Sequence, residues 1–174
     1  MLATWLTISC ALMAFLMSTH MGVFKVSTLS NGFATKSGDK KLFLHFLYAG
    51  CGCSRNIANR ISQMTENKNE IHQVYWIEDD KNTSPKFPRF IQFHSLSETD
   101  PRLSNIHGAP QLHVYQNNKS LYQGGYTNTK ATFLTNWVVD EIRQDRIPAS
   151  APIKGCYIPK NQNTFIANLW KKII

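Results

Sequence analysis

The run LFLHFLY at residues 42–48 constrains the fold of this 174-residue chain more than any other segment. It is apolar except for His45, and it is too short for a buried helix. Such a run is typical of a strand that is covered on both faces. SRNIANRISQM (54–64) follows with apolar side chains at helical spacing. The folded part therefore begins as strand, tight turn and helix, which indicates an α/β fold.

The segments that follow continue this alternation of strands and helices. The pattern predicts strands at 72–78, 111–116 and 120–123 and helices at 100–105 and 129–144. Asn117-Asn118 is the expected hairpin turn between the last two strands. Residues 79–95 contain Pro85 and Pro88 and are predicted to be an inserted loop with room for one short element. This order predicts a central mixed β-sheet flanked by helices.

The N-terminal run at residues 2–19 carries no charge, and the first basic side chain is Lys25. At about 1.5 Å per helical residue, the run approaches the hydrocarbon thickness of a bilayer, so we predict a membrane-directed segment. It lacks a basic start, and the best small-x-small site, Gly32-Phe33-Ala34, lies far downstream. We therefore favour an uncleaved anchor over a cleaved signal, with a buried helix as the third alternative. The expected division is 1–24 anchor or signal segment, 25–40 tether, 41–145 folded domain and 146–174 C-terminal extension.

Charge and cysteine content exclude two classes of protein. The formal net charge of +8 comes from scattered lysines and arginines, and no basic stripe interleaves with aromatic residues. Nucleic-acid binding is therefore not expected. Four cysteines are too few for a disulfide scaffold at this length. Cys10 lies inside the apolar run, which leaves Cys51, Cys53 and Cys156 for the domain.

Cys51 and Cys53 stand in the turn YAGCGCSR between the first strand and the first helix. The pair fits a redox dithiol, two ligands of a soft metal, or small residues that pack in a turn. A thiolate at a helix N-terminus is stabilised by free backbone N–H groups and the helix dipole, and Arg55 adds positive charge. Cys51 is thus the expected nucleophile, and Cys53 is the nearby thiol expected to resolve a mixed disulfide. Cys156, beyond the closing helix, is an alternative resolving thiol, a structural partner or a free cysteine.

Over residues 41–143 the order of elements and the cysteine turn resemble the thioredoxin superfamily. Laid without gaps on the Trp-Cys-Gly-Pro-Cys turn of thioredoxins, Cys51 takes the nucleophile position, Cys53 the proline position and Ser54 the second-cysteine position. His45 takes the position of a buried acidic residue. Small membrane-tethered bacterial thioredoxin-like proteins with a Cys-x-Cys-Ser turn are the nearest match. The resemblance implies a three-layer thioredoxin-like fold.

The resemblance also implies a role for Pro110. This residue matches the proline that is cis in thioredoxins and lies against the catalytic cysteine. The backbone of Ala109 would then pair with an extended substrate. A simple proline at the start of a strand is the alternative.

The sequence predicts different roles for the histidines of the domain. His45 is expected to accept or relay a proton for the resolving thiol, or else to be a satisfied core residue. His107, three residues before Pro110, is expected near the cysteines. His113 is expected to be structural, and His72 and His94 are expected to have surface or packing roles.

The expected function is that of a membrane-tethered, extracytoplasmic thiol-disulfide oxidoreductase or isomerase. Its partners would be protein thiols or disulfides, a further redox protein and the inner membrane, with the domain in the periplasm or exported and no cofactor. One alternative is a thioredoxin-like copper-binding protein that uses Cys51, Cys53 and His107, because thiolates and imidazole suit Cu(I). Another is a non-catalytic binding module that uses residues 79–95. A peroxidase is disfavoured because Tyr48 stands where such enzymes carry Thr or Ser.

Overall fold

The central strand of the molecule is β2 (Lys41–Tyr48), in which every residue before Tyr48 is buried. Successive side chains of a strand point to opposite faces of the sheet. Phe43 and Leu47 accordingly join one hydrophobic cluster, and Leu44 and Phe46 join another. The strand predicted at 42–48 is confirmed, together with its burial on both faces.

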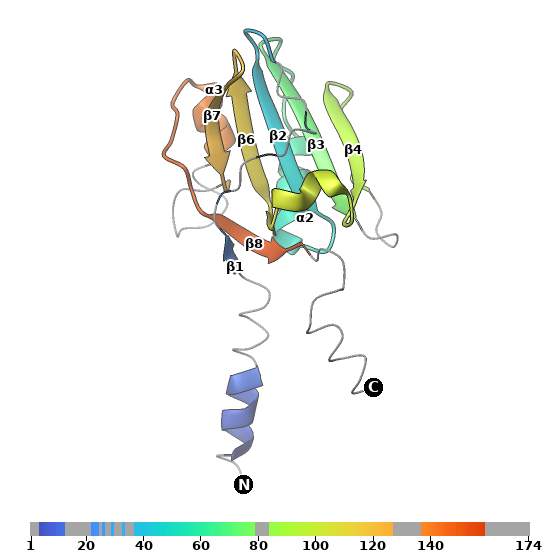
Figure 1. Cartoon of the computed structure of the whole chain (residues 1–174), viewed down its shortest axis with the longest axis vertical. Helices are drawn as coiled ribbons and strands as arrows, with labels where there is room; N and C mark the ends of the chain where they lie inside the picture. Colours follow the sequence, from blue (N-terminus) through green and yellow to red (C-terminus); the bar gives the residue numbers. More distant parts are fainter. Residues whose placement is uncertain are drawn as a thin grey trace.

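This computed structural model describes residues 4–12, 22–24, 26, 29, 33, 37–78, 84–126 and 137–158. Five strands form a mixed sheet in the order β4-β3-β2-β6-β7 (Figure 1). β3 lies parallel to β2 and β4 parallel to β3, whereas β6 is antiparallel to β2 and β7 antiparallel to β6. The bounds are β3 Glu70–Glu78, β4 Ile91–Ser97, β6 Gln111–Gln116 and β7 Lys119–Gly124. The predicted central mixed sheet is therefore confirmed.

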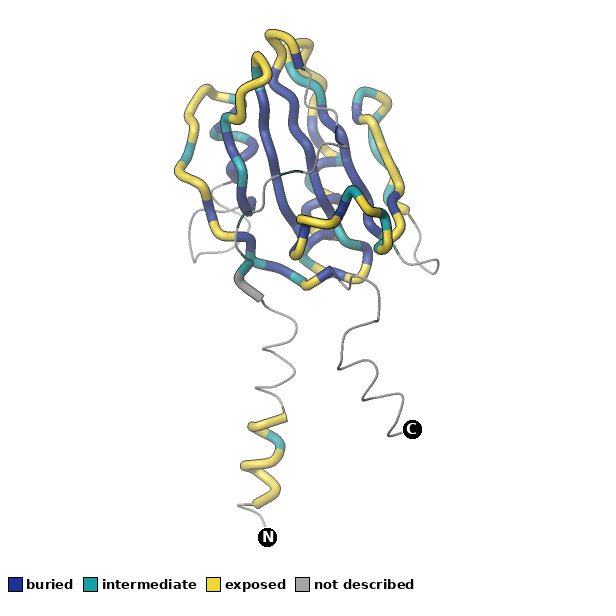
Figure 2. Tube along the Cα trace, viewed as in Figure 1, coloured by how far each residue is buried: buried dark blue, intermediate teal, exposed yellow. Residues whose placement is uncertain are grey.

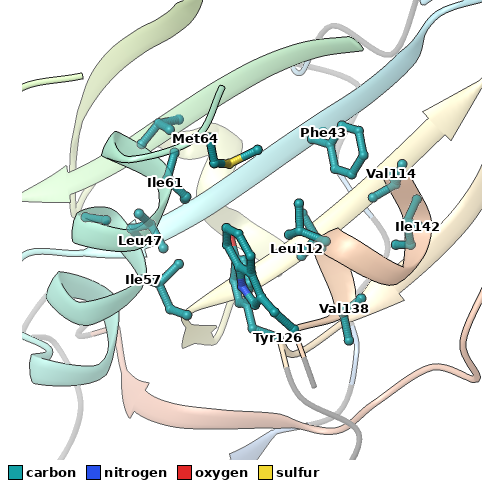
Figure 3. Packing of buried hydrophobic residues seen from close by; sticks show 14 of the residues in the cluster. Phe43, Leu47, Ile57, Ile61, Met64, Leu112, Val114, Tyr126, Val138 and Ile142 are labelled. Atoms are coloured by element: carbon teal, nitrogen blue, oxygen red, sulfur yellow. The ribbon is translucent and has the colours of Figure 1, made fainter. Parts of the chain in front are cut away.

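Helices cover both faces of this sheet. On one face, α2 (Gly52–Ser62) and α3 (Val138–Arg143) pack their apolar side chains against the sheet around Phe43 and Leu47 (Figure 3). On the other face, Leu103 of the 3-10 helix η1 (Pro101–Asn105) joins the second cluster. Figure 2 shows the burial concentrated in the middle of the sheet. The chain is thus a mixed α/β protein.

A smaller sheet crosses one end of the large one (Figure 1). It has the order β1-β8-β5, and its bounds are β1 Gly22–Phe24, β5 Gly108–Ala109 and β8 Ile153–Tyr157. β8 is antiparallel to both neighbours. The C-terminal extension therefore returns to the loop that precedes β6.

Two predictions about secondary structure need correction. β4 (Ile91–Ser97) extends through the C-terminal part of the predicted loop 79–95. It is an edge strand with four consecutive exposed residues, so its sequence lacks the apolar pattern of a buried strand. β8 was not predicted at all, because the strand IKGCY contains a glycine and a lysine and shows no β pattern.

The predicted helices correspond to helices of the structure, with shifted bounds. α2 begins and ends two residues earlier than the predicted helix 54–64, and the helix expected at 100–105 is a 3-10 helix. Within the predicted helix 129–144, residues 129–136 lie outside the described part, and α3 occupies Val138–Arg143.

The structure describes only part of the predicted N-terminal membrane-directed segment. Residues 4–12 are helical, and Trp5, Leu6 and Ile8 are exposed. Residues 1–3 and 13–21 of the expected anchor lie outside the described residues. Among the helices that are described, none is long and apolar enough to cross a membrane.

Candidate functional site

Cys51 is the N-cap residue of α2 and is fully buried. Its N–H donates to the Tyr48 carbonyl at 3.0 Å, and its own carbonyl accepts from the Arg55 N–H at 3.1 Å. A Cβ atom at Gly50 would come within 2.8 Å of the Tyr48 ring, so a larger residue there would displace that ring. The first turn of α2 carries no acidic residue. The helix N-terminus is therefore free to stabilise a thiolate at Cys51.

The structure joins Cys51 to Cys156 of β8 by a disulfide. Their Cα atoms are 5.7 Å apart across a sequence separation of 105 residues. Cys53, the partner favoured by sequence reasoning, is a free cysteine of intermediate exposure. The pairing follows from the return of β8 to the loop before β6, a long-range contact that sequence spacing does not encode.

Ala109 lies directly against this disulfide, and Pro110 follows it in the chain. The Ala109–Pro110 peptide bond is cis, as the resemblance implied. The Cys51 Sγ atom lies 3.7 Å from the Ala109 carbonyl oxygen. Ala109 is also the register partner of Cys156 in the β5–β8 pair. The residue expected to pair with an extended substrate thus pairs with an extended segment of its own chain.

Ser54 and Arg55 fix the turn that carries Cys51. The buried Ser54 hydroxyl accepts a hydrogen bond from the Tyr48 N–H at 3.1 Å, which ties the end of β2 to the first turn of α2. The Arg55 side chain donates through Nε to the Ala49 carbonyl at 2.9 Å. Both residues therefore brace the strand-to-helix turn, and Arg55 also places a cation beside it.

His45 belongs to a buried chain of polar groups on the face of the sheet covered by α2 and α3. Its Nδ1 lies 2.7 Å from the Tyr126 hydroxyl, and its Nε2 lies 3.1 Å from Nδ1 of His72. Nε2 of His72 lies 3.2 Å from the Glu70 carboxylate, which also pairs with Arg143 at 3.0 Å. One arrangement satisfies every link: Tyr126 donates to His45, His45 to His72, and His72 to Glu70.

Burial sets the charge states in this chain. Desolvation, and then the neighbouring His72, hold the pKa of His45 well below its ordinary value, so its ring is neutral. Desolvation raises the pKa of Tyr126 well above its ordinary value, so its hydroxyl stays protonated. For Glu70, burial alone would raise the pKa, but hydrogen bonds and charge from His72 and Arg143 outweigh it and lower the pKa. Within this row of hydrogen-bonded side chains, Glu70 is therefore anionic, and His45 and Tyr126 are neutral.

The sequence predicted a site role for His45 but not for the residues that contact it. His72 was expected to have a surface or packing role, and it is instead a buried link between His45 and Glu70. Glu70, Tyr126 and Arg143 were not singled out. Two histidines on neighbouring predicted strands were a signal in the sequence, although the register that brings them together was not.

The residues of the copper alternative are not assembled as a ligand group. Cys51 is bonded to Cys156, and His107 is exposed, with its carbonyl accepting from the Ile158 N–H at 3.2 Å. Over the described ranges, no three His, Cys, Asp or Glu side chains are arranged to hold a metal ion. His113 is buried on β6, beside Gln111.

A polar pocket of about 360 Å³ opens at the start of β2 and β3, near the opposite end of β2 from Cys51. Its lining includes two cations that already have ionic partners. Lys41 pairs with Asp145 at 2.7 Å, and Arg143 pairs with Glu70. These pairings satisfy the pocket's buried charges without a ligand.

Comparison with known proteins finds similar folds but indicates no function. No protein-family model matches the chain, and no curated protein matches it. A solved structure of an uncharacterized conserved protein from Geobacillus kaustophilus is similar, with a TM-score of 0.55, 14% identity and coverage of 83% of this chain and 96% of that one. A hypothetical protein from Sinorhizobium meliloti gives a TM-score of 0.53, 12% identity and coverage of 83% and 99%. At these identities the likeness concerns the fold alone.

Proposed function

We propose that this chain is a thiol-disulfide oxidoreductase or isomerase of thioredoxin-like fold that acts on protein thiols or disulfides through Cys51. The observation that carries the proposal is the Cys51–Cys156 disulfide at the N-terminus of α2, beside the Ala109 carbonyl. A helix N-terminus stabilises a thiolate, which makes Cys51 both a good leaving group and a good nucleophile. Cys156, rather than Cys53, takes the role of the second redox cysteine.

The chemistry is a two-electron exchange between two sulfur pairs. When the Cys51–Cys156 disulfide is reduced to two thiols, a client or donor dithiol is oxidised to a disulfide and releases two protons. The reverse exchange reduces a client disulfide. Each half proceeds by attack of a thiolate on a disulfide sulfur, with departure of the other sulfur as a thiolate. No cofactor is needed for this exchange.

The proposed site of action is the periplasmic face of the inner membrane. Residues 2–19 are uncharged and would serve as the anchor, with residues 25–40 as the tether. Disulfides persist in oxidising compartments, which agrees with the Cys51–Cys156 bridge.

The test is a redox titration of the full chain in detergent micelles. The protein is equilibrated across glutathione buffers, alkylated, and mapped at Cys51, Cys53 and Cys156 by peptide mass spectrometry. We expect one reversible bridge, Cys51–Cys156. In the Cys51→Ser variant, the rate of exchange with a disulfide-containing protein client should fall by about a hundredfold or by more, because the variant lacks the nucleophile.

The control for this test is Cys10→Ser, which removes an exposed cysteine of the N-terminal helix and should exchange at the wild-type rate. Wild-type exchange by Cys51→Ser would rule out the proposed function. A reversible Cys51–Cys53 bridge would return the role of second redox cysteine to Cys53.

A further inference from the structure

β8 pairs with β5 beside Cys51, at the residue that the resemblance assigned to an extended substrate. Cys156 pairs with Ala109 and Tyr157 with Gly108, and the Ile158 N–H donates to the His107 carbonyl at 3.2 Å. Both residues of β5 therefore already pair with β8 along the edge next to the disulfide. While the Cys51–Cys156 bridge is closed, a second strand has no access to this edge, and Cys51 has no exposed surface.

We propose that β8 and an extended client segment occupy this position alternately, and that the return of β8 releases the client. The proposal rests on the proposed function and extends it by naming the client and the direction of exchange. Opening the bridge lets β8 leave β5, and a client disulfide in an extended segment then pairs with Ala109 and meets the Cys51 thiolate. Because the client position exists only with the bridge open, the client-binding form is the reduced form.

The proposed exchange consists of two successive attacks by thiolates. The Cys51 thiolate attacks one sulfur of the client disulfide, a Cys51–client bond forms, and the second client sulfur leaves as a thiolate that takes a proton from water. β8 then returns, and the Cys156 thiolate attacks the Cys51 sulfur and expels the remaining client sulfur, which is also protonated. The client disulfide has gained two electrons and two protons, and Cys51 and Cys156 have been oxidised. A dithiol donor must reduce them again.

Two features of β8 suit a strand that leaves and returns. Its pairings are short, three residues with β1 and two with β5, and short strand pairs are marginal by themselves. Ile153 and Ile158, one at its start and one just beyond its end, are fully buried. These two anchors give the returning strand one register, which places Cys156 opposite Ala109. The Cys51–Cys156 disulfide thus links β8, a weakly paired strand, covalently to the N-terminus of α2.

Gly155 is the positioning residue in this arrangement. A Cβ atom there would overlap the Ala109 carbonyl oxygen and would come within 2.8 Å of Pro110 Cδ. The first of these atoms belongs to the backbone and the second to a proline ring, so neither can move aside by a side-chain rotation. A side chain at Gly155 should therefore hinder the return of β8 while leaving all four thiols in place.

The first measurement is hydrogen exchange by mass spectrometry on the full chain in detergent micelles, with and without reductant. We expect peptides that cover 153–158 to exchange about tenfold faster or more in the reduced form, while β2 and β6 keep their protection. The Cys156→Ser variant, which keeps Gly155, should show the fast exchange without reductant. Unchanged protection of 153–158 in both cases would overturn the proposal even if Cys51-dependent thiol exchange were intact.

The second measurement follows the mixed disulfide between Cys51 and a synthetic peptide closed by one intramolecular disulfide. Gly155→Ala should accumulate this species, with a lifetime about tenfold longer or more than in the wild type. Ala149→Ser, which adds one atom at an exposed position before β8, is the matched control and should resolve it at the wild-type rate. Wild-type resolution by Gly155→Ala would overturn strand return. A wild-type rate of peptide reduction in Cys51→Ser would instead remove the proposed function itself.

Discussion

His113 is a titratable side chain that lies fully buried on β6. Burial lowers its pKa to about 4, well below the ordinary value of a histidine. Its Nδ1 atom has no hydrogen-bond partner among the described residues. The folded protein therefore keeps His113 neutral at pH values where the unfolded chain protonates it.

This difference makes folding acid-sensitive. The folded pKa lies below the unfolded value of about 6.5, so stability is full above that pH and falls as the pH drops toward about 4. One histidine contributes about 1.4 kcal/mol per pH unit in this window. The wild type should therefore lose about 2 kcal/mol more than His113→Gln between about pH 7 and pH 5. Urea unfolding at both pH values measures this, and equal losses in the two proteins would contradict it.

The sequence predicts single residues best where their role is local. Cys51 could be assigned from the turn and the helix that follows it, because the N-terminal dipole of a helix acts on the residue that starts it. Cys156 and His72 depend on partners 105 and 27 residues away. Those partners are fixed by strand register and by the return of β8, and neither is encoded by spacing along the chain.

At the scale of elements, α2 is tied to β2 through one hydroxyl. The buried Ser54 hydroxyl accepts the Tyr48 N–H, which comes at the last residue of β2. Removing the hydroxyl leaves this N–H without its acceptor. We expect Ser54→Ala to lower the free energy of unfolding by about 1–3 kcal/mol. Ser62→Ala, which removes a more exposed hydroxyl at the end of α2, is the matched control for denaturant unfolding. A loss no larger than in Ser62→Ala would contradict the assignment.

The predictability of each element follows its burial. β2, β3 and β6 are buried along most of their length, so their apolar runs could be found in the sequence. β4 buries only Ile91 and Leu96, and its sequence shows no strand pattern. β8 is stabilised by a disulfide and by neighbouring strands, so its five residues need no strong β-propensity of their own.

At the scale of the whole molecule, the Cys51–Cys156 bridge closes a long loop in the unfolded chain. For a loop of roughly 100 residues, the chain-entropy model assigns about 4–5 kcal/mol to such a cross-link. We therefore expect Cys156→Ser, or reduction of the wild type, to lower the free energy of unfolding by an amount of this order. Guanidinium unfolding with and without reductant measures the change. Cys53→Ser keeps the bridge and should remain sensitive to reductant, whereas a reductant-insensitive wild type would show that the bridge is absent.

The same bridge changes what a backbone cut does to the molecule. Strands β3 to β7 and both α2 and α3 lie between Cys51 and Cys156, so they belong to one covalent ring. A single cleavage within that ring, such as after the exposed Arg146, leaves one linked molecule in the oxidised state. In the reduced state the same cut turns β8 into a separate peptide that only noncovalent contacts hold. These contacts include its strand pairing, its two buried isoleucines and the hydrogen bonds of Ala151 with Tyr122 and Gly125.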